Sequence, residues 1–379
     1  MIGLATPYLT NNYGTKLQAF ALQSFFNINN IENEIIDYRF NGKIYDIRKI
    51  FLSNRKQYKD VQEKRKAALA CNQAYKVGYD TRNKCFKEFV EKRLMLSAPC
   101  SNLNEVAKLA EGRYSAVVCG SDQIWLPSHA IEKYYLLNFL PKSLKKIAYA
   151  PSFGVSEIPS LVKSDYKKAI ADFDTVTTRE NRGKEIVKEL TGRECSVVVD
   201  PTLLLTAEEW ESLLGICQPV YKKKYVFSYF IGSSIEHRQF AKKFSDSIGA
   251  KLIILPNVSE VVPADLEYSD YAPYDVGPSE FVNLIKNAEA VFTDSFHGTV
   301  FSLIFGKNFY SFERFKSNSK ASTNSRIYSL LKNTNLENRL IRKYDEIVTN
   351  EQAINYDEVH GLINDMRQNS INIIREAVK

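Results

Sequence analysis

The chain has 379 residues, enough for two domains with separate cores, and its 44% hydrophobic and 25% charged residues are ordinary for a globular protein. No apolar run reaches the ~18 residues that span a bilayer, and the start of the chain lacks the basic and apolar regions of a signal peptide. The six cysteines form no C-x-x-C pair and have no histidine nearby at ligand spacing. This pattern indicates neither a zinc site nor a disulfide framework, and it fits reduced thiols in a cytoplasm.

The first forty residues predict a βαβ unit. A buried strand is expected at Ile2–Thr6, a helix with one apolar side at Thr15–Phe26, and a second strand at Asn33–Tyr38. The loop at residues 7–14 leads into the N-terminus of that helix. Loops that leave the carboxyl ends of parallel strands bind ligands in α/β proteins, so this loop is a candidate substrate contact, although asparagine and glycine also make plain turns.

Positive charge is concentrated in residues 41–95, which we expect to form helices. This segment has 15 Lys and Arg but 6 Asp and Glu, an excess of nine that is larger than the +7 of the whole chain. A solvated helical face is the usual explanation for such a run. The functional alternative is contact with anionic lipid headgroups or with a diphosphate-bearing substrate. Nucleic acid is not expected as a partner, because no stacking or groove-reading motif accompanies the charge.

The rest of the chain alternates strands with helices. Strands are expected at 116–119, 146–150, 175–178, 196–199, 225–230, 251–255, 290–293 and 308–312, and helices at 161–173, 235–248 and 279–286. This alternation predicts an α/β fold with doubly wound parallel sheets. A polar, Lys-rich stretch at 206–224 marks the expected domain boundary, which gives Rossmann-like domains at 1–205 and 206–350. The last helices, 351–379, are expected to pack back on the first domain.

The most informative stretch is Val291–Val300. Two apolar residues end a strand, a polar turn follows with His297 next to Gly298, and an apolar helix begins. A helix N-terminus attracts anions, glycine allows close backbone approach, and histidine moves protons near neutral pH. The turn is therefore a candidate site for an anionic substrate. The alternative is a capped helix whose histidine is hydrogen-bonded in the core.

Six motifs in order resemble the polysaccharide pyruvyl transferase family. They cover residues 12 to about 330, while the basic segment matches poorly. The motifs are Asn12-Tyr13-Gly14-x-x-Leu17-Gln18-Ala19, Gly120-Ser121-Asp122-Gln123-x-Trp125, Tyr149-Ala150-x-Ser152-Phe153-Gly154, Arg179-Glu180, Asp200-Pro201-Thr202-Leu203-Leu204 and Thr293-Asp294-Ser295-Phe296-His297-Gly298-Thr299. The resemblance implies two Rossmann-like domains facing a cleft, as in GT-B-like glycosyltransferases. It also implies transfer of pyruvate from phosphoenolpyruvate to two sugar hydroxyls, forming a cyclic ketal without a metal or other cofactor.

The resemblance also implies roles for particular residues. His297 is the expected proton carrier, and Asp122 the base for a sugar hydroxyl. Arg179 and Arg326 are the expected cations for phosphoenolpyruvate. The remaining predicted contacts are Ser295, Gly298 and Thr299 for phosphoenolpyruvate, and Asn12, Gly14, Gln18, Ser121 and Gln123 for the acceptor or its loop.

One departure from the family pattern concerns Ser295. Several members have an arginine two residues before the motif histidine, and we expect Arg326 to replace it here. Asp122 could instead cap a helix, and Arg179 could pair with a neighbouring acid.

The acceptor expected from the resemblance is a sugar on a lipid diphosphate or a nucleotide, used in capsule or exopolysaccharide assembly. The protein would then be cytoplasmic, with peripheral contact at the inner membrane face as an option. The alternatives are a GT-B-type nucleotide-sugar glycosyltransferase and a non-catalytic sugar-binding or assembly protein.

Overall fold

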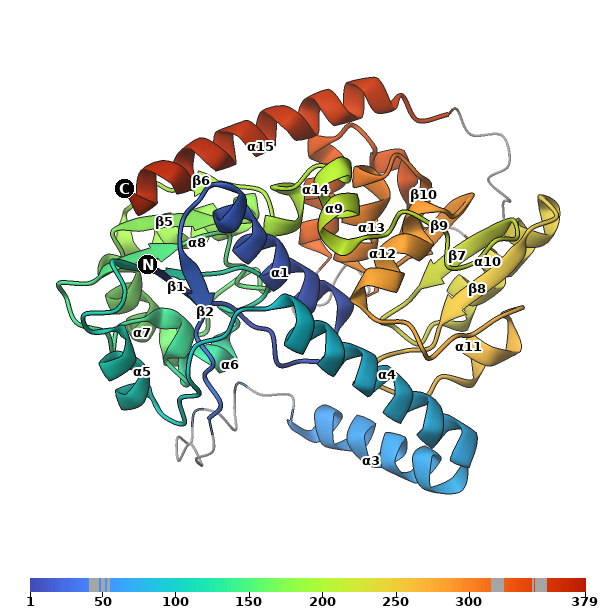
Figure 1. Cartoon of the computed structure of the whole chain (residues 1–379), viewed down its shortest axis with the longest axis horizontal. Coiled ribbons are helices and arrows are strands. Elements are labelled where there is room, and N and C mark those ends of the chain that lie inside the picture. The colour runs from blue at the N-terminus through green and yellow to red at the C-terminus, as the bar shows by residue number, and fades with distance from the viewer. Residues whose placement is uncertain (41–47, 49–51, 53–54, 315–323, 343, 345–352) are drawn as a thin grey trace.

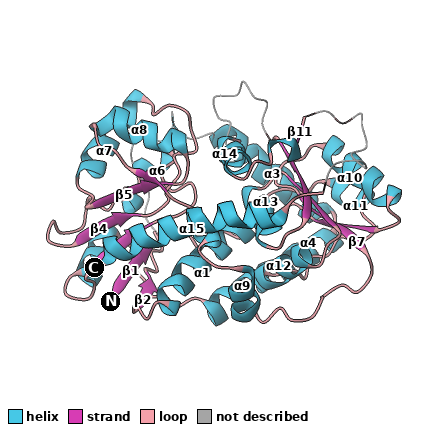
Figure 2. Cartoon of the chain, turned by 90° about the horizontal axis from the view of Figure 1, so that it is seen from above, coloured by secondary structure: helices cyan, strands magenta, loops and turns pink. Residues whose placement is uncertain are grey.

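The structure is a computed structural model that describes residues 1–40, 48, 52, 55–314, 324–342, 344 and 353–379. Part of the predicted basic segment, within residues 41–54, therefore lies outside the described residues. Two parallel sheets with helices around them form the molecule, and Figure 2 shows them on opposite sides of a layer of helices. The predicted α/β class with two doubly wound sheets is confirmed.

The first sheet has the strand order β2-β1-β3-β4-β5-β6, and all of its pairs are parallel. The chain reverses its winding direction between β1 and β3, so the crevice at the carboxyl ends of these two strands is where such sheets bind ligands. The strands are β1 (Ile2–Ala5), β2 (Asn33–Ile35), β3 (Ala116–Cys119), β4 (Lys145–Ala148), β5 (Thr175–Thr178) and β6 (Ser196–Val197). The associated helices are α1 (Tyr13–Ile28), α5 (Leu103–Ala110), α6 (Pro127–Ala130), η1 (Tyr134–Leu136), α7 (Ser160–Ala171), α8 (Asn181–Thr191) and η2 (Pro201–Leu203).

The second sheet has the order β11-β10-β9-β7-β8, again with parallel pairs, and its winding reverses between β7 and β9. The strands are β7 (Tyr225–Tyr229), β8 (Lys251–Leu255), β9 (Ala290–Thr293), β10 (Asn308–Phe312) and β11 (Leu340–Ile341). The helices of this half are α9 (Ala207–Leu214), α10 (Ile235–Ser247), α11 (Pro263–Glu267), α12 (Pro278–Lys286), α13 (Phe296–Ile304), α14 (Ser325–Asn333) and η3 (Glu337–Arg339).

The first helix begins two residues earlier than the sequence pattern predicts. The Asn12 side chain accepts a hydrogen bond from the backbone N–H of Thr15 at 3.3 Å, so Asn12 is the N-cap of α1. Tyr13 and Gly14, which we expected in a loop, therefore form the first turn of α1. Because of this earlier start, Gly14 lies in the first turn of α1, on the side that meets the second half of the molecule.

Helices α1 and α15 (Tyr356–Val378) join the two halves. The Tyr13 ring stacks on Phe281 with ring centroids 4.7 Å apart, and its hydroxyl donates to the carbonyl of Val276 at 2.9 Å. One continuous cluster of buried apolar residues runs through both halves along this contact. Aromatic pairs of this kind contribute about 0.5–1.5 kcal/mol beyond the free energy gained from the apolar area that they bury. The packing of α1 therefore stabilises the contact between the two halves.

Helix α15 runs along one side of the molecule, across both sheets (Figure 1). At one end, His360 Nε2 is 2.9 Å from the carbonyl of Leu303, and further along the Ser370 hydroxyl accepts a hydrogen bond from the Val199 N–H at 3.0 Å. The domain limits at 205/206 and 350/351 stay a prediction. Of the helices in the described part of the chain, none has the length and apolar character needed to cross a membrane.

The described part of the basic segment is an antiparallel pair of helices, α3 (Arg55–Cys71) and α4 (Gln73–Arg93), which projects from one end (Figure 1). Helix α4 docks on the second half of the molecule, because the Tyr79 hydroxyl and the Arg82 guanidinium both donate to the carbonyl of Asn257. The lysines on its outer face pair with acids one turn away: Lys76 with Asp80, Lys84 and Lys92 with Glu88, and Lys87 with Glu91. These pairs favour a solvated face for α4 over a membrane-binding one.

Candidate active site

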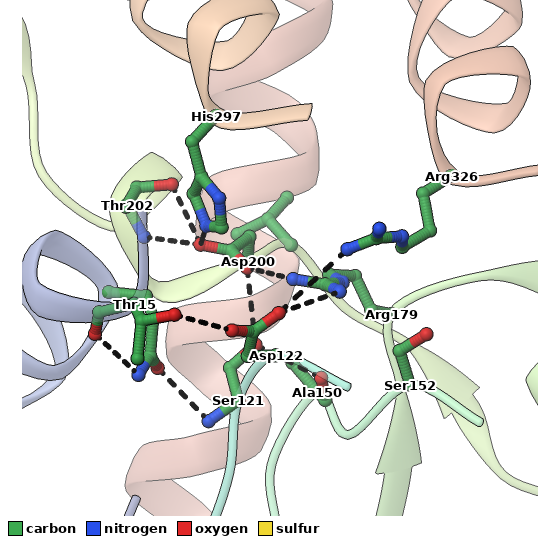
Figure 3. A network of polar contacts seen from close by, with 12 residues as sticks. Thr15, Ser121, Asp122, Ala150, Ser152, Arg179, Asp200, Thr202, His297 and Arg326 are labelled. Carbon is green, nitrogen blue, oxygen red and sulfur yellow. Dashed lines mark hydrogen bonds and ion pairs between the residues drawn. The ribbon is translucent and has the colours of Figure 1, made fainter. Parts of the chain in front are cut away.

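A buried carboxylate, Asp200, lies at the centre of the polar network drawn in Figure 3. Asp200 directly precedes the short helix η2, and it accepts hydrogen bonds from the Thr202 N–H and hydroxyl at 3.1 and 2.7 Å. The Ser121 hydroxyl, which follows β3, donates from 3.2 Å. Burial alone would raise the pKa of Asp200, but the charges of His297 and Arg179, together with hydrogen bonding from Thr202, outweigh burial and hold that pKa well below its usual range.

Arg179 follows strand β5 and forms the closest ion pair of the network. Its Nη1 lies 2.5 Å from Asp200, its Nη2 lies 3.9 Å from Asp122, and its side chain is 2% exposed. In the described structure its Nε and Nη2 atoms are buried without a hydrogen-bond partner. Such unsatisfied donors are costly, so Arg179 has hydrogen-bonding capacity that an added anion would satisfy.

Arg326, in the first turn of α14, brings a second guanidinium from the other half of the chain. Its Nη1 lies 3.8 Å from Asp122 Oδ1, and its Nε is buried without a partner among the described residues. Burial, reinforced by the nearby charge of Arg179, lowers the pKa of Arg326 to about 9. Two buried guanidinium groups that disfavour each other's charge form a site that an anion would stabilise.

Asp122 joins the two arginines from the loop after β3. One of its oxygens faces both guanidinium groups, and the other accepts a hydrogen bond from the Thr15 hydroxyl at 3.0 Å. Burial raises the pKa of Asp122, but the charges of Arg179, His297 and Arg326 outweigh burial, so the pKa is below its ordinary value. Its backbone lies in the left-handed region with φ 69°, which aspartate tolerates better than most residues.

His297 reaches this cluster from the first turn of α13 (Figure 3). Its Nε2 lies 3.8 Å from Asp200 Oδ1 and has no hydrogen-bond partner among the described residues. Its other ring nitrogen lies against the first turn of α1, where a side-chain carbon built on Gly14 would overlap Nδ1. Only glycine at position 14 therefore lets the imidazole approach so closely.

The arginines border a cavity of about 170 Å³ between the two sheets. Arg179 and Asp200 line it from the first half, and Phe296 and Arg326 from the second. The Phe296 ring lies against both guanidinium groups, whose central carbons are 4.7 and 5.5 Å from its centroid. The Phe296 ring is itself buried, and it stabilises the two cations by cation–π contact. Helix α15 closes the far side with Met366, Asn369 and Ser370.

The predicted acceptor-side residues lie around the carboxyl end of the first sheet. Gln18 is fully buried and bridges two loops, because its amide donates to the carbonyl of Pro7 at 2.9 Å and accepts from the N–H of Ser121 at 3.2 Å. Asn12 caps α1, and the Gln123 amide nitrogen is buried without a partner among the described residues. In the structure these side chains shape the loops, and their contact with an acceptor stays a prediction.

The other predicted phosphoenolpyruvate contacts lie at the N-terminus of α13. The Ser295 hydroxyl caps the helix by accepting from the Gly298 N–H at 3.4 Å. The Thr299 hydroxyl is fully buried and 2.8 Å from the Ser311 hydroxyl in β10, and Gly298 packs closely on Thr293. Each of these groups has a partner within the second half of the molecule, and their contact with phosphoenolpyruvate is untested.

Sequence reasoning missed Asp200 as a site residue. It belongs to a motif that carries the family resemblance, and an Asp-Pro-Thr run directly after a predicted strand end was the available signal. The motif alone could not show that the Arg179 guanidinium and the His297 imidazole both point at this carboxylate, because the three residues come from distant parts of the chain.

Two parallel sheets, each covered by helices, with a buried charged network between them define a two-sheet protein of the α/β class. The model of the polysaccharide pyruvyl transferase family matches residues 12–317, and the chain therefore belongs to this family. No curated protein sequence matches the chain.

Solved structures resemble this chain over nearly its whole length at low sequence identity. The UDP-GlcNAc 2-epimerase from Methanocaldococcus jannaschii is 12% identical with a TM-score of 0.48, covering 97% of this chain and 92% of that one. The ADP-heptose lps heptosyltransferase II from E. coli is 9% identical with a TM-score of 0.38, covering 96% and 98%. A functionally uncharacterized protein from Klebsiella pneumoniae is 12% identical with a TM-score of 0.45, covering 90% and 92%.

Proposed function

We propose that the protein transfers pyruvate from phosphoenolpyruvate to two hydroxyls of a sugar in a polysaccharide precursor, forming a cyclic pyruvate ketal. The observation that carries this proposal is the pair of buried guanidinium groups, Arg179 and Arg326, that line one cavity with Asp200, whose Oδ1 lies 3.8 Å from His297 Nε2. Membership of the polysaccharide pyruvyl transferase family supports the class of reaction. A role in capsule or exopolysaccharide assembly, in the cytoplasm or at the inner face of the membrane, is part of the same proposal.

Phosphoenolpyruvate suits the charge and the size of the cavity. It carries a carboxylate and a phosphate, and guanidinium groups bind both through paired hydrogen bonds. The cavity of about 170 Å³ is smaller than the ~300–1,000 Å³ of pockets that hold drug-sized ligands, so it suits a small anion. Binding would satisfy the donors of Arg179 and Arg326 that now lack partners and would relieve the repulsion between the two cations.

The reaction needs two proton transfers and no net oxidation. A sugar oxygen attacks carbon 2 of phosphoenolpyruvate while carbon 3 gains a proton and becomes a methyl group. The bond between carbon 2 and the phosphate oxygen then breaks, and the second sugar oxygen takes its place. One hydroxyl proton therefore ends on the methyl carbon and the other leaves with inorganic phosphate. We assign the proton transfers to His297, which general acid–base catalysis would make worth about 10²–10⁴-fold in rate.

Asp122 fits a different role from the base that the resemblance implies. A general base works best with a pKa near the operating pH, whereas the pKa of Asp122 is below its ordinary value. Before the substrate binds, the carboxylate of Asp122 offsets the positive charge of the two arginines. An incoming carboxylate or phosphate would compete with the carboxylate of Asp122 for Arg326.

The alternative function is a nucleotide-sugar glycosyltransferase. Such an enzyme needs backbone N–H groups for a diphosphate where the second sheet reverses its winding, between β7 and β9. There the N–H groups of Ile231 and Gly232 already donate to the carboxylate of Asp294, at 2.6 and 2.8 Å. The loop between β7 and α10 thus has a negative group where a diphosphate would have to bind. This occupancy counts against a nucleotide sugar as the donor.

The deciding experiment incubates the full-length protein with phosphoenolpyruvate labelled in the pyruvyl group and with lipid-linked galactose, glucose or N-acetylmannosamine acceptors. We expect release of inorganic phosphate and one label per acceptor sugar, resistant to base and released by mild acid as pyruvate. Absence of transfer to every acceptor would overturn the proposed reaction.

A thermal-shift measurement separates the two candidate donors. Phosphoenolpyruvate at a hundred times its Kd should stabilise the protein by about 2.7 kcal/mol. UDP-galactose should not displace phosphoenolpyruvate, so the stabilisation by phosphoenolpyruvate should persist when both ligands are present. Stabilisation by the nucleotide sugar alone would favour the glycosyltransferase.

A further inference from the structure

A second cavity lies between the two halves, apart from Arg179 and Arg326. It has a volume of about 560 Å³, within the ~300–1,000 Å³ range of small-molecule sites. We call it the hairpin groove, because α3 and α4 form one wall. Its opposite walls are the loop that leads into α1 and the loop that follows β8; Asn11, Gln62, Arg65, Asn83, Phe86 and Ser259 are among its lining residues.

The hairpin groove is connected to His297 through the first turn of α1. Asn11 lines the groove and is followed by the cap Asn12, and two residues later Gly14 lies against the imidazole. Phe86 lines the groove and packs on the ring of Tyr13, with centroids 4.8 Å apart. The groove is also bordered by loops that leave the carboxyl ends of β1 and β8, the edges where both sheets are expected to bind ligands.

The lining of the groove is neutral or positive. Amide and hydroxyl groups of Asn11, Gln62, Asn83 and Ser259 offer donors and acceptors, and none of the described residues that line it carries a carboxylate. The Asn11 amide donates to the Asn83 side-chain carbonyl at 3.0 Å, which links the loop before α1 to α4. Side-chain amides of this kind suit sugar hydroxyls, which both donate and accept.

Two arginines line the groove and have different tasks. Arg82 is fully buried and donates to the backbone carbonyls of Pro256 and Asn257, so its guanidinium is used to dock α4. Arg65 is half-buried, and its guanidinium lies over the ring of Tyr79 at 4.7 Å from the centroid. In the described part of the chain no carboxylate pairs with Arg65. A guanidinium that is oriented by an aromatic ring and lacks an acidic partner is suited to bind a phosphate.

We propose that the hairpin groove binds the sugar acceptor, and that Arg65 binds a phosphate or diphosphate ester attached to that sugar. The proposal rests on the proposed function, since an acceptor presupposes a transfer reaction. It gives the described part of the basic segment a specific task, in which one oriented cation selects acceptors carried on a phosphate. The carrier could be a lipid or a nucleotide, because both present the same charged group.

The test measures binding of the methyl glycosides and the 1-phosphates of galactose, glucose and N-acetylmannosamine to the full-length protein. We expect at least one 1-phosphate to bind ten-fold or more tightly than its methyl glycoside, and this preference to be lost in Arg65→Gln. Lys64→Gln is the matched control, because it removes the same charge from the neighbouring, exposed position of α3. Equal binding by the two variants, or no preference for a phosphate in the wild-type protein, would overturn the proposal.

Two further arms identify the carrier and separate this proposal from the reaction itself. UDP-galactose and galactose on farnesyl diphosphate distinguish a nucleotide from a lipid source, and Arg65→Gln should weaken whichever binds more tightly. Arg65→Gln should raise the KM for the acceptor by about ten-fold and leave phosphoenolpyruvate binding unchanged. If transfer proceeds normally in Arg65→Gln, the groove assignment alone fails. If phosphoenolpyruvate does not bind although Arg65 still selects sugar phosphates, the proposed function fails and the groove assignment stands.

Discussion

The carboxyl edges of the two sheets meet between the halves of the molecule, yet they use their acids in different ways. At the first edge, Asp122 and Asp200 face the guanidinium groups of Arg179 and Arg326 beside a cavity. At the second edge, Asp294 binds the backbone of its own half, at the N–H groups of Ile231 and Gly232. A ligand can therefore replace existing ion pairs at the first edge. At the second edge, the carboxylate already has its hydrogen-bond partners within its own half.

This difference explains how the residues of one motif divide their tasks. Asp294 fixes the loop after β7 and Ser295 caps α13, whereas His297 extends to the first edge. A rigid second edge fixes the orientation of α13, and so it holds the imidazole at 3.8 Å from Asp200 without requiring a bond between them. Preorganisation of this kind keeps a proton carrier in place before the substrate binds.

The largest expected effect comes from removing the proton carrier that the second half of the molecule contributes to the cluster. His297→Gln should lower kcat for pyruvyl transfer by about 10²–10⁴-fold, because glutamine cannot exchange a proton near neutral pH. The affinity for phosphoenolpyruvate, measured by calorimetry, should change little, since the arginines remain. His129→Gln, at a partly exposed position outside the cluster, is the control and should keep wild-type turnover. Turnover of His297→Gln at the wild-type rate would rule out the catalytic assignment.

The second prediction concerns His237, a buried histidine at the second edge, and the pH dependence of the free energy of unfolding. Burial lowers the pKa of His237 to about 4, and its ring stacks on Phe312 with centroids 4.4 Å apart. In the unfolded chain this histidine binds a proton below pH ~6.5, so the unfolded state holds more protons between pH 6.5 and 4. The free energy of unfolding should therefore fall by about 3 kcal/mol as the pH drops through this window, with no further loss from this group below pH 4.

The measurement for that prediction is a series of urea titrations between pH 7 and 4. His237→Gln should be less stable at pH 7, because it loses the stacking on Phe312, yet its pH slope across this window should be flatter than that of the wild-type protein. Asp200 contributes little to this slope, because its folded pKa is depressed and an unfolded aspartate takes up its proton only around pH 3.9 and below. An unchanged slope in the variant would show that His237 does not carry the effect.

A smaller effect is expected from Asp294 itself. Asp294→Asn should lower the free energy of unfolding by about 2 kcal/mol, because one of two backbone N–H groups then meets an amide NH₂ in place of a carboxylate oxygen. The urea midpoint should fall with an unchanged m-value. Glu194→Gln, which breaks a fully exposed pair with Lys188, removes the same charge and should leave the midpoint unchanged. Equal midpoints for the two variants would contradict the structural use of Asp294.

Most of the secondary structure could be predicted because strands and helices follow local patterns. The strands at 251–255, 290–293 and 308–312 have the expected limits, since short apolar runs bounded by polar turns define them. The start of α1 was placed two residues too late because asparagine and glycine at residues 11–14 are typical of a turn. The cap is settled by a single hydrogen bond from Thr15.

The candidate site could be predicted only in part, for a physical reason. Arg179 and His297 were expected to converge, and they do approach one carboxylate. Asp200, the carboxylate between them, was not chosen, because neither composition nor spacing shows that a buried acid needs cations from two halves of the chain. The hairpin groove could not be predicted either, since it exists only because Tyr79 and Arg82 dock α4 against the loop after β8.

The smallest predicted effect tests whether the first edge depends on α15. The Val199 N–H, next to Asp200, donates to the Ser370 hydroxyl at 3.0 Å, so Ser370→Ala should leave a buried N–H without an acceptor. We expect a loss of about 1 kcal/mol in the free energy of unfolding and faster amide hydrogen exchange at Val199. Ser370 also lines the cavity that Arg179 and Arg326 border, where we propose that phosphoenolpyruvate binds. The variant should therefore weaken phosphoenolpyruvate binding by a few fold without changing kcat. Unchanged exchange at Val199 would mean that the backbone around Asp200 is held by Thr202 and Arg179 alone, and that α15 only covers the cavity.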